Sequence, residues 1–331
     1  MSNKSKTIRI ATRQSPLALW QAEHVGELIR TNDADIDVEY LKLVTKGDKI
    51  LDQALSKVGG KDLFVKEIEH ALIEGAAEVA VHSLKDMPTS LPAALAITAF
   101  PPREDPRDAL VSTKGYTFEK LPEGARVGTC SLRRAAQLLR LRPDLRIVPI
   151  RGNVATRLRK LDEEDMDATI LAYAGLVRLE MTEVVTEILS PQVSLPAVGQ
   201  GILAVETRKD DSATNALVTR FDDAAARAAA LAERAFLHAL QGGCQVPIAG
   251  HAVVTKRSKD AHDDAGDGAR THAPEILSMR GLVASLDGTE TIEGEAEGSP
   301  HQAAEVGRGL AKVLLAQGAG RILEALKTAA S

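Results

Sequence analysis

The chain has 331 residues, which is enough for two or three domains of ordinary size. Hydrophobic residues make up 44% of it and charged residues 26%, close to the average of soluble globular proteins, so disordered, collagen-like and coiled-coil chains are excluded. A net charge of −5 and an aromatic content of 3% argue against nucleic acids and anionic membranes as partners.

The cellular location is suggested by the N-terminus and the cysteines. Residues 1–7 are polar and lack the apolar stretch of a signal peptide, and no segment reaches the roughly 18 apolar residues of a membrane span. Two cysteines, Cys130 and Cys244, are too few for a disulfide framework and are typical of a reducing cytosol, and their surroundings show no metal-ligand spacing. We expect a cytoplasmic protein without a metal, and we expect a monomer.

Short β-rich runs alternate with helical patterns in the N-terminal third, which predicts an α/β domain with a parallel sheet. Ser15 and Pro16 supply an N-cap and a first-turn proline, so a helix is expected to begin there. A second helix is predicted over residues 62–74. The expected strands cover residues 7–11, 38–44, 78–82 and 95–100.

A proline pair, Pro101 and Pro102, opens a polar segment that is expected to cross into a second lobe. There the pattern restarts, with strands predicted at 109–112, 126–128, 146–150 and 168–172 and helices over 131–140 and 154–161. A second crossing at 195–201 leads to a strand at 202–207 that returns to the first sheet. The predicted fold class is α/β, with two similar doubly wound lobes, residues 1–101 with 202–219 and residues 107–195, enclosing a cleft as in periplasmic binding proteins.

The composition changes at residue 222, and residues 222–331 are expected to form a small α+β domain. An alanine-rich helix is predicted to end at the pair Gly242 and Gly243. Asp287 and Gly288 indicate a hairpin turn. Strands are expected near 248–254, 277–286 and 289–295, a final helix over 302–327, and a mobile surface insertion over 256–274.

Residues 126–159 hold nine arginines against a single acid, Asp144, within an acidic chain. For Arg140, Arg142 and Arg159, helical spacing can point the side chain outward, so a solvated basic face stays open as an interpretation.

Other polar residues stand where a strand gives way to a helix. They are Arg13 and Ser15 in the first lobe, and Thr129, Ser131, Arg133, Arg134, Arg151 and Arg157 in the second. Helix N-termini present free N–H groups and a partial positive charge, so these turns are candidate anion sites. No glycine-rich phosphate loop is present, and planar guanidinium groups match carboxylates, so we expect carboxylate ligands.

Lys85 and Asp86 follow a predicted strand at its C-terminal end, the edge where α/β folds bind ligands. In isolation such a sequence is more often a surface turn. An acid facing an arginine-lined cleft would be held ionised and can stabilise a cation. His82 is expected to be packed or hydrogen-bonded rather than catalytic, and Cys244 is open to two interpretations, a small buried hydrophobe or a reactive thiol.

Taken together, these residues resemble the porphobilinogen deaminase (hydroxymethylbilane synthase) family along nearly the whole chain. The resemblance is carried by six blocks in order: residues 11–19, 62–67, 82–88, 128–134 with 137–138, 151–153 with 156–157, and 242–244 with 246–247. Their joint occurrence is far more specific than any one block. Two departures are Cys130, where the family often has serine, and the long segment 256–274.

The resemblance implies a transferase that joins four porphobilinogen units head to tail on a dipyrromethane cofactor held by Cys244 through a thioether. Each unit loses ammonia to give a cation, which an ionised Asp86 would stabilise. By the same resemblance, the cofactor carboxylates would be bound by Lys85, Ser83, Thr129, Ser131, Arg133 and Arg134. The substrate would be bound by Arg13, Ser15, Arg151, Arg157, Arg178 and Gln200, and by Lys61 and Phe64 of a mobile loop over the site.

A second function of another class stays open from the residues alone. A two-lobed protein that binds a carboxylate ligand without reacting would use the same lobes and the same arginines. Neither an export signal nor a helix-turn-helix pattern supports it, and such a protein would have no use for the Gly242–Cys244 segment. An intact mass above that of the sequence would separate the two.

Overall fold

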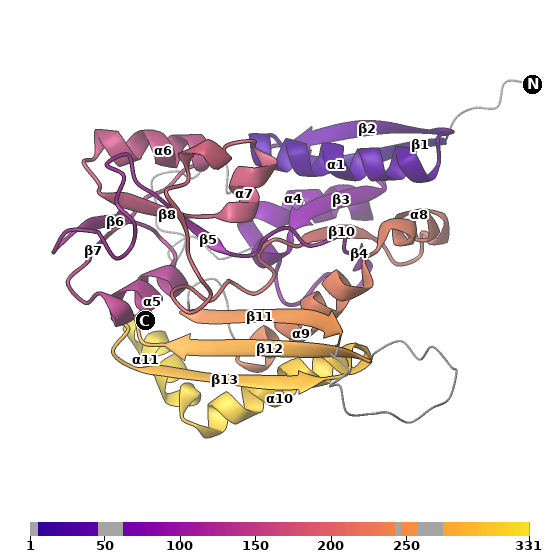
Figure 1. The fold of residues 1–331 in the computed structure, drawn as a ribbon. Coiled ribbons are helices and arrows are strands. Elements are labelled where there is room, and N and C mark those ends of the chain that lie inside the picture. The colour runs from indigo at the N-terminus through magenta and orange to yellow at the C-terminus, as the bar shows by residue number, and fades with distance from the viewer. Residues whose placement is uncertain (1–5, 46–61, 242–245, 257–273, 331) are drawn as a thin grey trace, which may run out of the picture.

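The computed structural model describes residues 6–45, 62–241, 246–256 and 274–330. Three sheets organise these residues, two of five strands and one of three. Figure 1 shows the two five-stranded sheets side by side, with the three-stranded sheet below them. The structure is α/β, with two similar lobes and a smaller C-terminal α+β part, as the sequence predicts. No helix in these ranges is both long and apolar enough to span a membrane.

The first sheet has the strand order β2-β1-β3-β10-β4. Its elements are β1 (Lys6–Arg13), α1 (Pro16–Asn32), β2 (Ile36–Leu43), α4 (Asp62–Ile73), β3 (Val79–Ser83), the 3-10 helix η1 (Leu84–Asp86), β4 (Leu95–Ala99), β10 (Leu203–Arg208), α8 (Ser212–Val218) and the 3-10 helix η3 (Thr219–Phe221). Ile8 and Ile10 of β1 pack with Val25 and Ile29 of α1 on one face, and Ala11 packs with α4 on the other. The sheet is therefore covered by helices on both faces.

The second sheet repeats this arrangement in the order β7-β6-β8-β5-β9. Its elements are β5 (Asp108–Val111), β6 (Arg126–Gly128), α5 (Leu132–Leu141), β7 (Arg146–Val148), α6 (Val154–Glu163), β8 (Ala168–Ala172), α7 (Tyr173–Arg178), the 3-10 helix η2 (Thr182–Val184) and β9 (Glu187–Ile188). Leu138 of α5 packs on one face of the sheet, while Leu161 of α6 and Leu176 of α7 pack on the other.

Each sheet contains one strand that directly follows a crossing: β10 in the first lobe and β5 in the second. In each sheet four strands run in one direction, and one strand, β10 or β5, runs antiparallel between its two neighbours. Leu203 of β10 pairs with Ser83, and Asp108 of β5 pairs with Ala172, so both crossing strands begin at the carboxyl ends of the parallel strands. The two crossings therefore meet the edge of each sheet at which α/β folds bind ligands.

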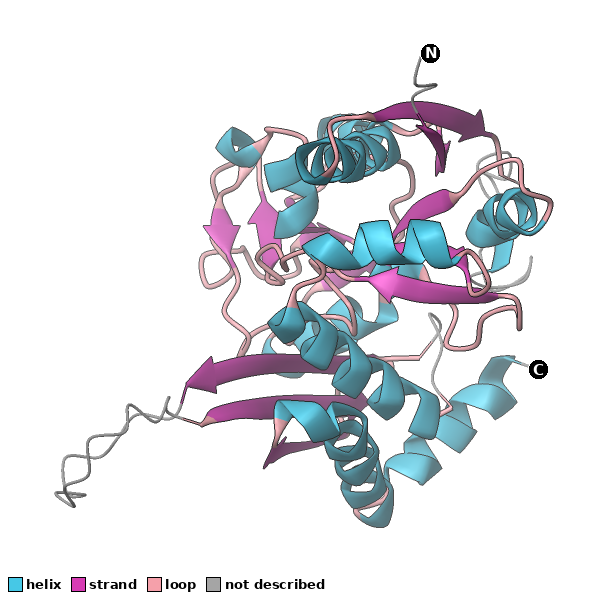
Figure 2. Ribbon diagram, turned by 90° about the vertical axis from the view of Figure 1, so that its right-hand side faces the viewer, coloured by secondary structure: helices cyan, strands magenta, loops and turns pink. Residues whose placement is uncertain are grey.

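The C-terminal part is a three-stranded antiparallel sheet with helices on one side. It comprises α9 (Ala224–Ala239), β11 (Ile248–Lys256), β12 (Glu275–Ala284), β13 (Thr291–Gly298), the 3-10 helix η4 (Pro300–Gln302), α10 (Ala303–Ala316) and α11 (Ala319–Ala330). In Figure 2 the strands of this sheet and the helices that cover it form separate layers. Phe236 of α9 is fully buried and packs with Leu310 of α10 and Met279 of β12.

A buried ion pair joins this part to both crossings. Glu233 of α9 is fully buried and accepts hydrogen bonds from Arg103 Nη1 at 2.6 Å, from Gly199 N at 2.6 Å and from Ala252 N at 2.8 Å. Arg103 and Gly199 lie in the first and second crossings, so one carboxylate fixes three segments of the chain together. A charge buried so deeply is tolerated because its oxygens are hydrogen-bonded.

Two predicted helix ends are wrong. The predicted helix over 302–327 is two helices, α10 and α11, because Gly318 between them has a φ of 104°, outside the right-handed region. Helix α9 ends at Ala239 with Leu240 as its C-cap, and the left-handed residue after the cap is Gln241, with a φ of 52°. Gly242 and Gly243, predicted as the cap, lie outside the described residues, as does nearly all of the predicted insertion at 256–274.

Candidate functional site

The chain leaves β3 of the first lobe at Ser83, and η1 then places Lys85 and Asp86 at the carboxyl end of that strand. Asp86 is exposed and Lys85 is partly buried. Gln21 of α1 donates to Ser83 Oγ at 2.8 Å, which fixes the start of this turn. Gly199 of the second crossing has a φ of 75°, and a Cβ there would lie 2.9 Å from Lys85 N, so the crossing approaches the turn closely. Asp86 is thus an available carboxylate on a well-supported turn.

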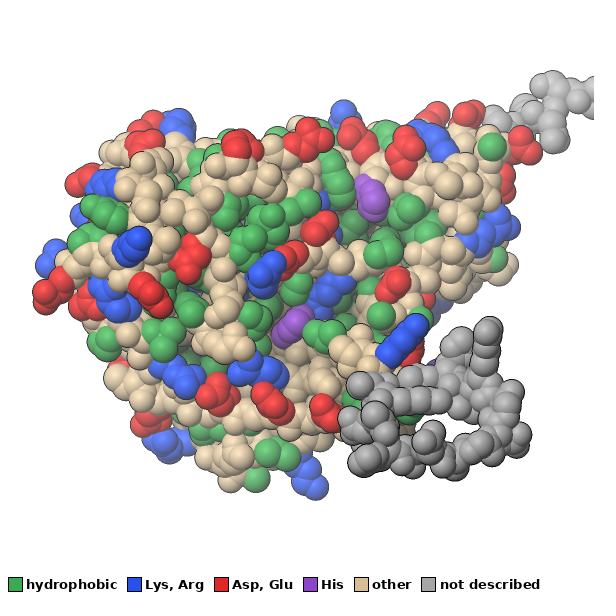
Figure 3. Space-filling model, viewed as in Figure 1, with side chains coloured by type: hydrophobic (Ala, Val, Ile, Leu, Met, Phe, Trp, Pro, Cys, Tyr) green, Lys and Arg blue, Asp and Glu red, His purple; other side chains and the backbone are tan. Residues whose placement is uncertain are grey.

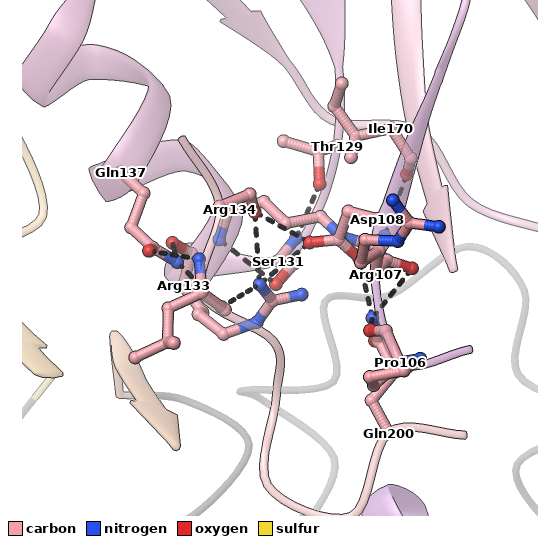
Figure 4. Close-up of polar contacts among 12 residues, drawn as sticks. Pro106, Arg107, Asp108, Thr129, Ser131, Arg133, Arg134, Gln137, Ile170 and Gln200 are labelled. Carbon is pink, nitrogen blue, oxygen red and sulfur yellow. Dashed lines mark hydrogen bonds and ion pairs between the residues drawn. The ribbon is translucent and has the colours of Figure 1, made fainter. Parts of the chain in front are cut away.

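The facing edge of the second lobe is the N-terminus of α5. Ser131 is its N-cap and accepts from Arg134 N at 3.4 Å, while the buried Thr129 accepts from Ser131 N at 3.1 Å (Figure 4). Serine and threonine are typical residues at such a helix start, although the sequence led us to expect these two hydroxyls as anion ligands. Both hydroxyls therefore already accept backbone hydrogen bonds, which fixes their orientation.

Arg133 and Arg134 are not exposed to solvent at this edge. Both are buried, and their side chains contact Asp108 (Figure 4). Arg133 Nη1 donates to Asp108 Oδ2 at 2.8 Å, and Arg134 Nη2 donates to Asp108 Oδ1 at 2.7 Å. Arg134 Nη1 also donates to the carbonyl of Ile170 at 2.8 Å. Two arginines of the segment 126–159 therefore share a buried carboxylate partner, Asp108, which comes from outside that segment.

Asp108 was not among the predicted site residues because its partners are distant from it in sequence. It is 25 residues from Arg133 and 26 from Arg134, and it begins β5 just after the polar first crossing. The one available signal was its position, the first residue of a strand that follows a crossing. Only the antiparallel insertion of β5 beside β8 brings it next to α5.

The electrostatics of the site are set by burial and by close opposite charges. Burial alone would raise the pKa of Asp108, but the guanidinium groups of Arg133 and Arg134 hold it well below its usual range. Burial lowers the pKa of Lys85 to about 8; Asp86 opposes this shift, and Arg134 adds to it. Lys85 Nζ donates to Gln200 Oε1 at 3.4 Å, which ties it to the second crossing.

Arg157 and Arg151 bring further positive charge to the same place. Arg157 of α6 donates from Nε to the carbonyl of Gly152 at 2.9 Å, and Asn153 caps the helix by accepting from Thr156 N. Burial lowers the pKa of Arg157, and the cations of Arg134 and Arg151 add to this effect while Asp86 opposes it. Arg157 therefore lies within electrostatic reach of Asp86 across the two lobes.

The remaining predicted binding residues lie at the lobe junction. Arg13 ends β1, and Ser15 caps α1 by accepting from Ala18 N at 3.4 Å. Arg178 ends α7; its Nη2 donates to the carbonyl of Gly201 at 2.7 Å, and its guanidinium lies 5.6 Å from the centre of the Trp20 ring. Gln200 is buried and donates to Asp108 Oδ1 at 2.9 Å. Thus Gln200 joins the charged cluster directly, whereas Arg178 contacts the second crossing and Trp20 of α1.

Several other predicted features can be placed. Cys244 and Lys61 lie outside the described residues, and Phe64 lies in the first turn of α4, so its predicted place in a loop is wrong. His82 is buried and contacts Glu206 at 3.0 Å, as expected of a hydrogen-bonded histidine. Each of the arginines expected to face solvent has an acidic partner on the surface or near it: Arg140 with Glu293, Arg142 with Asp144 and Arg159 with Glu163.

The donor set at the lobe junction fits a ligand that carries several carboxylates. Five cations gather there, from Lys85, Arg133, Arg134, Arg151 and Arg157, against the two carboxylates of Asp86 and Asp108. Cationic side chains together with helix N-termini suit anions, and guanidinium groups suit carboxylates in particular. The fold is that of a two-lobed α/β protein, and the charges at the junction of its lobes suit an anionic ligand.

Comparison with known sequences assigns the family. The descriptions "Porphobilinogen deaminase, dipyromethane cofactor binding domain" and "Porphobilinogen deaminase, C-terminal domain" match residues 8–216 and 227–316. The porphobilinogen deaminase of Syntrophotalea carbinolica is 52% identical over 322 residues, which are 97% of this chain and 96% of the relative. That of Carboxydothermus hydrogenoformans is 47% identical over 97% of this chain and 98% of the relative. The chain belongs to the porphobilinogen deaminase family.

Membership in this family gives the activity expected from the resemblance. The chain is a transferase of tetrapyrrole biosynthesis that deaminates and joins porphobilinogen units, and it uses a dipyrromethane cofactor. This decides against the alternative of a protein that only binds its ligand. Among solved structures, the chain is similar to the periplasmic aliphatic sulphonate binding protein SsuA of Escherichia coli, with a TM-score of 0.39, 12% identity and 71% of each chain covered.

Proposed function

We propose that Asp86 is the catalytic carboxylate of this enzyme and that Cys244 carries the dipyrromethane. The observation that supports this most directly is that Asp86 is exposed at the end of β3, while the cations of Lys85 and Arg157 lie within electrostatic reach of it. An ionised carboxylate there stabilises positive charge that develops on the substrate when ammonia leaves. Its oxygens also accept a hydrogen bond from a pyrrole N–H.

The other assignments divide the cations between cofactor and substrate. Cofactor carboxylates are bound by the set nearest α5 and η1, which comprises Ser83, Lys85, Thr129, Ser131, Arg133 and Arg134. Substrate carboxylates are bound by Arg13, Ser15, Arg151, Arg157, Arg178 and Gln200, with Lys61 and Phe64. When bound, the cofactor supplies the pyrrole carbon that the first substrate unit joins.

Each residue acts on the cofactor or the substrate in a way that its surroundings support. Arg157 and Arg151 orient carboxylates because guanidinium groups hold them through two parallel hydrogen bonds. Lys85 supplies a point charge whose protonated fraction falls above a pH of about 8. Asp86 offsets the cation formed when the C–N bond breaks and the nitrogen leaves as ammonia.

We also propose that the protein works as a monomer in the cytoplasm and does not bind nucleic acid. The low cysteine content supports a reducing compartment. On the face that Figure 3 shows, acidic and basic side chains are interspersed, whereas a nucleic-acid surface needs a field of one sign. Sedimentation at working concentration tests the oligomeric state.

Intact mass spectrometry tests the cofactor assignment. We expect the purified protein to exceed its sequence mass by one dipyrromethane, and Cys244→Ser to lose that addition. Cys130→Ser is the matched control, since Cys130 is an exposed thiol beside the arginines of the site and should be dispensable for attachment. An addition that survives in Cys244→Ser and disappears in Cys130→Ser would transfer the assignment to Cys130.

A further inference from the structure

Asp108 is the most fully engaged polar group of the site, and neither the sequence motifs nor the proposed catalytic roles include it. Its side chain is completely buried at the start of β5, on the carboxyl edge of the second lobe. We propose that Asp108 is a positioning residue: it orients Arg133 and Arg134 for cofactor carboxylates and couples them to Lys85 of the first lobe. This inference rests on the proposed function, because it takes the two arginines as cofactor ligands.

Both oxygens of Asp108 have several donors. Oδ1 accepts from Arg134 Nε at 3.1 Å, from Arg134 Nη2 at 2.7 Å and from Gln200 Nε2 at 2.9 Å. Oδ2 accepts from Arg133 Nη1 at 2.8 Å and from Ser194 Oγ at 2.7 Å. Arg134 donates to Oδ1 through two of its nitrogens and to the Ile170 carbonyl through the third, so all three nitrogens hold its guanidinium in place.

The charge of this cluster favours a ligand. Two guanidinium groups surround one carboxylate, so Asp108 lowers the cost of burying them but leaves one positive charge uncompensated. Arg133 contacts Asp108, Ser194 and Leu195 through Nη1, and the structure gives its Nε and Nη2 no hydrogen bond within the described ranges. A second carboxylate, supplied by the cofactor, would complete the neutralisation.

Gln200 extends the arrangement to the other lobe. Its Nε2 donates to Asp108, and its Oε1 accepts from Lys85 Nζ, whose neighbour in sequence is Asp86. The side chain is held in the second crossing, where Nε2 also donates to the carbonyl of Pro106 at 2.6 Å. The arginines of the second lobe and the lysine of the first are therefore oriented through one buried carboxylate and one amide.

Asp108→Asn tests the proposal, because it keeps the size of the side chain and removes its charge. We expect the fraction of purified protein that carries the cofactor mass to fall at least tenfold in this variant. Leu138→Ala is the matched control. Leu138 is a fully buried core residue of α5, the helix that carries Arg133 and Arg134, so its truncation destabilises the lobe and leaves the contacts of Asp108 in place. Cofactor loss in both variants at equal melting temperature would reduce Asp108 to a structural residue and overturn the proposal.

A double-mutant cycle provides the readout that a purely structural role would not change. If Asp108 acts through Arg134, then Asp108→Asn should add less than twofold to the cofactor loss already caused by Arg134→Gln. Multiplicative losses would overturn the proposal. Should Arg134→Gln keep its cofactor, the ligand assignment of Arg134 in the proposed function fails instead, so the two failures are distinguishable.

A milder variant covers the case in which Asp108→Asn does not fold. Ser194→Ala removes one hydrogen bond to Asp108 Oδ2 and one from Arg133. We expect it to fold and to carry the cofactor in a fraction reduced two- to fivefold. A wild-type fraction in Ser194→Ala, together with a wild-type Michaelis constant for porphobilinogen, would contradict the proposed positioning.

Discussion

The two lobes present one aspartate each at the carboxyl edge of their sheets, and the two surroundings are opposite. Asp108 of the second lobe is fully buried and surrounded by two arginines, a glutamine and a serine. Asp86 of the first lobe is exposed, and the cations of Lys85 and Arg157 lie near it without saturating it. A carboxylate whose oxygens are all engaged can only hold its neighbours, whereas an exposed one can act on a substrate.

The contrast predicts that stability and activity separate at the two positions, and the largest effect on stability is expected at Asp108. Asp108→Ala leaves two buried guanidinium groups without their counter-charge, which typically costs about 3–5 kcal/mol. Asp86→Ala changes an exposed side chain and should alter stability by no more than about 0.5 kcal/mol. Urea unfolding of both variants measures this, and equal costs would contradict the comparison.

Turnover should show the reverse order, with the larger loss at Asp86. Asp86→Asn keeps the size of the side chain but deletes its charge, and removing one preorganised stabilising group commonly costs about 10²–10³ in turnover, or roughly 2.7–4 kcal/mol. Single-turnover consumption of porphobilinogen, in protein whose mass confirms the cofactor, is the measurement. Asp86→Glu should retain more activity than Asp86→Asn. An Asn variant with wild-type turnover would mean that another group stabilises the cation.

The comparison also shows what local sequence patterns can predict. The cap of α1 and the first crossing could be predicted, because Ser15 and the prolines after β4 determine the backbone within a few residues of their own positions. The ligand edge with Lys85 and Asp86 followed from their place after a strand. The partner of Arg133 and Arg134 could not be predicted from the local sequence, since only the insertion of β5 into the second sheet brings Asp108 to α5.

The ends of two helices also could not be predicted from the local sequence. Gly242 and Gly243 matched the usual composition of a C-cap, yet Gln241 has the left-handed conformation after α9. The run 302–327 has a continuous helical pattern, and a single glycine, Gly318, divides it. Such choices depend on how α9 and α10 pack in the C-terminal core, which a local pattern does not contain.

An intermediate loss of stability is expected where the C-terminal part lies close to α5. Gly288, in the turn between β12 and β13, has a φ of 73°, and a Cβ there would lie 2.6 Å from Arg140 N and also clash with the carbonyl of Ala136. We expect Gly288→Ala to cost about 1–3 kcal/mol, since backbone must move in addition to the strained φ. Gly115→Ala is the matched control: its φ is also 73°, and no atom lies within 4 Å of the added Cβ. Equal melting temperatures would exclude the packing contribution.

Lys85 is the sequence neighbour of Asp86 and is linked to Asp108 through Gln200. As the pH rises, loss of its proton should change protein stability and ligand binding in opposite directions. Burial lowers its folded-state pKa to about 8, while an unfolded lysine has a pKa of about 10.4. Between these values the unfolded chain holds the proton that the folded chain has released, so stability relative to Lys85→Met should rise with pH. Binding of cofactor carboxylates should weaken over the same range, because the cation is lost. Urea unfolding and the fraction of protein that assembles the cofactor, both measured from pH 7 to 10, test both signs, and parallel curves for the two proteins would contradict them.

The smallest effect is expected at the far end of α5, where the arginine pattern continues but the surroundings change. Arg140 is 39% exposed and its partner Glu293 is 47% exposed, so water and salt screen their 3.0 Å ion pair. Arg140→Leu should therefore cost about 0.2–1 kcal/mol and leave the cofactor mass unchanged. Arg134→Leu, one and a half turns earlier on the same helix, should destabilise the protein and remove the cofactor. Measured side by side by urea unfolding and intact mass, the two variants separate a buried arginine that has Asp108 as its partner from one that belongs to a solvated face. A cofactor loss in Arg140→Leu equal to that in Arg134→Leu would show that the position on the helix, and with it the contact with Asp108, does not decide the role of these arginines.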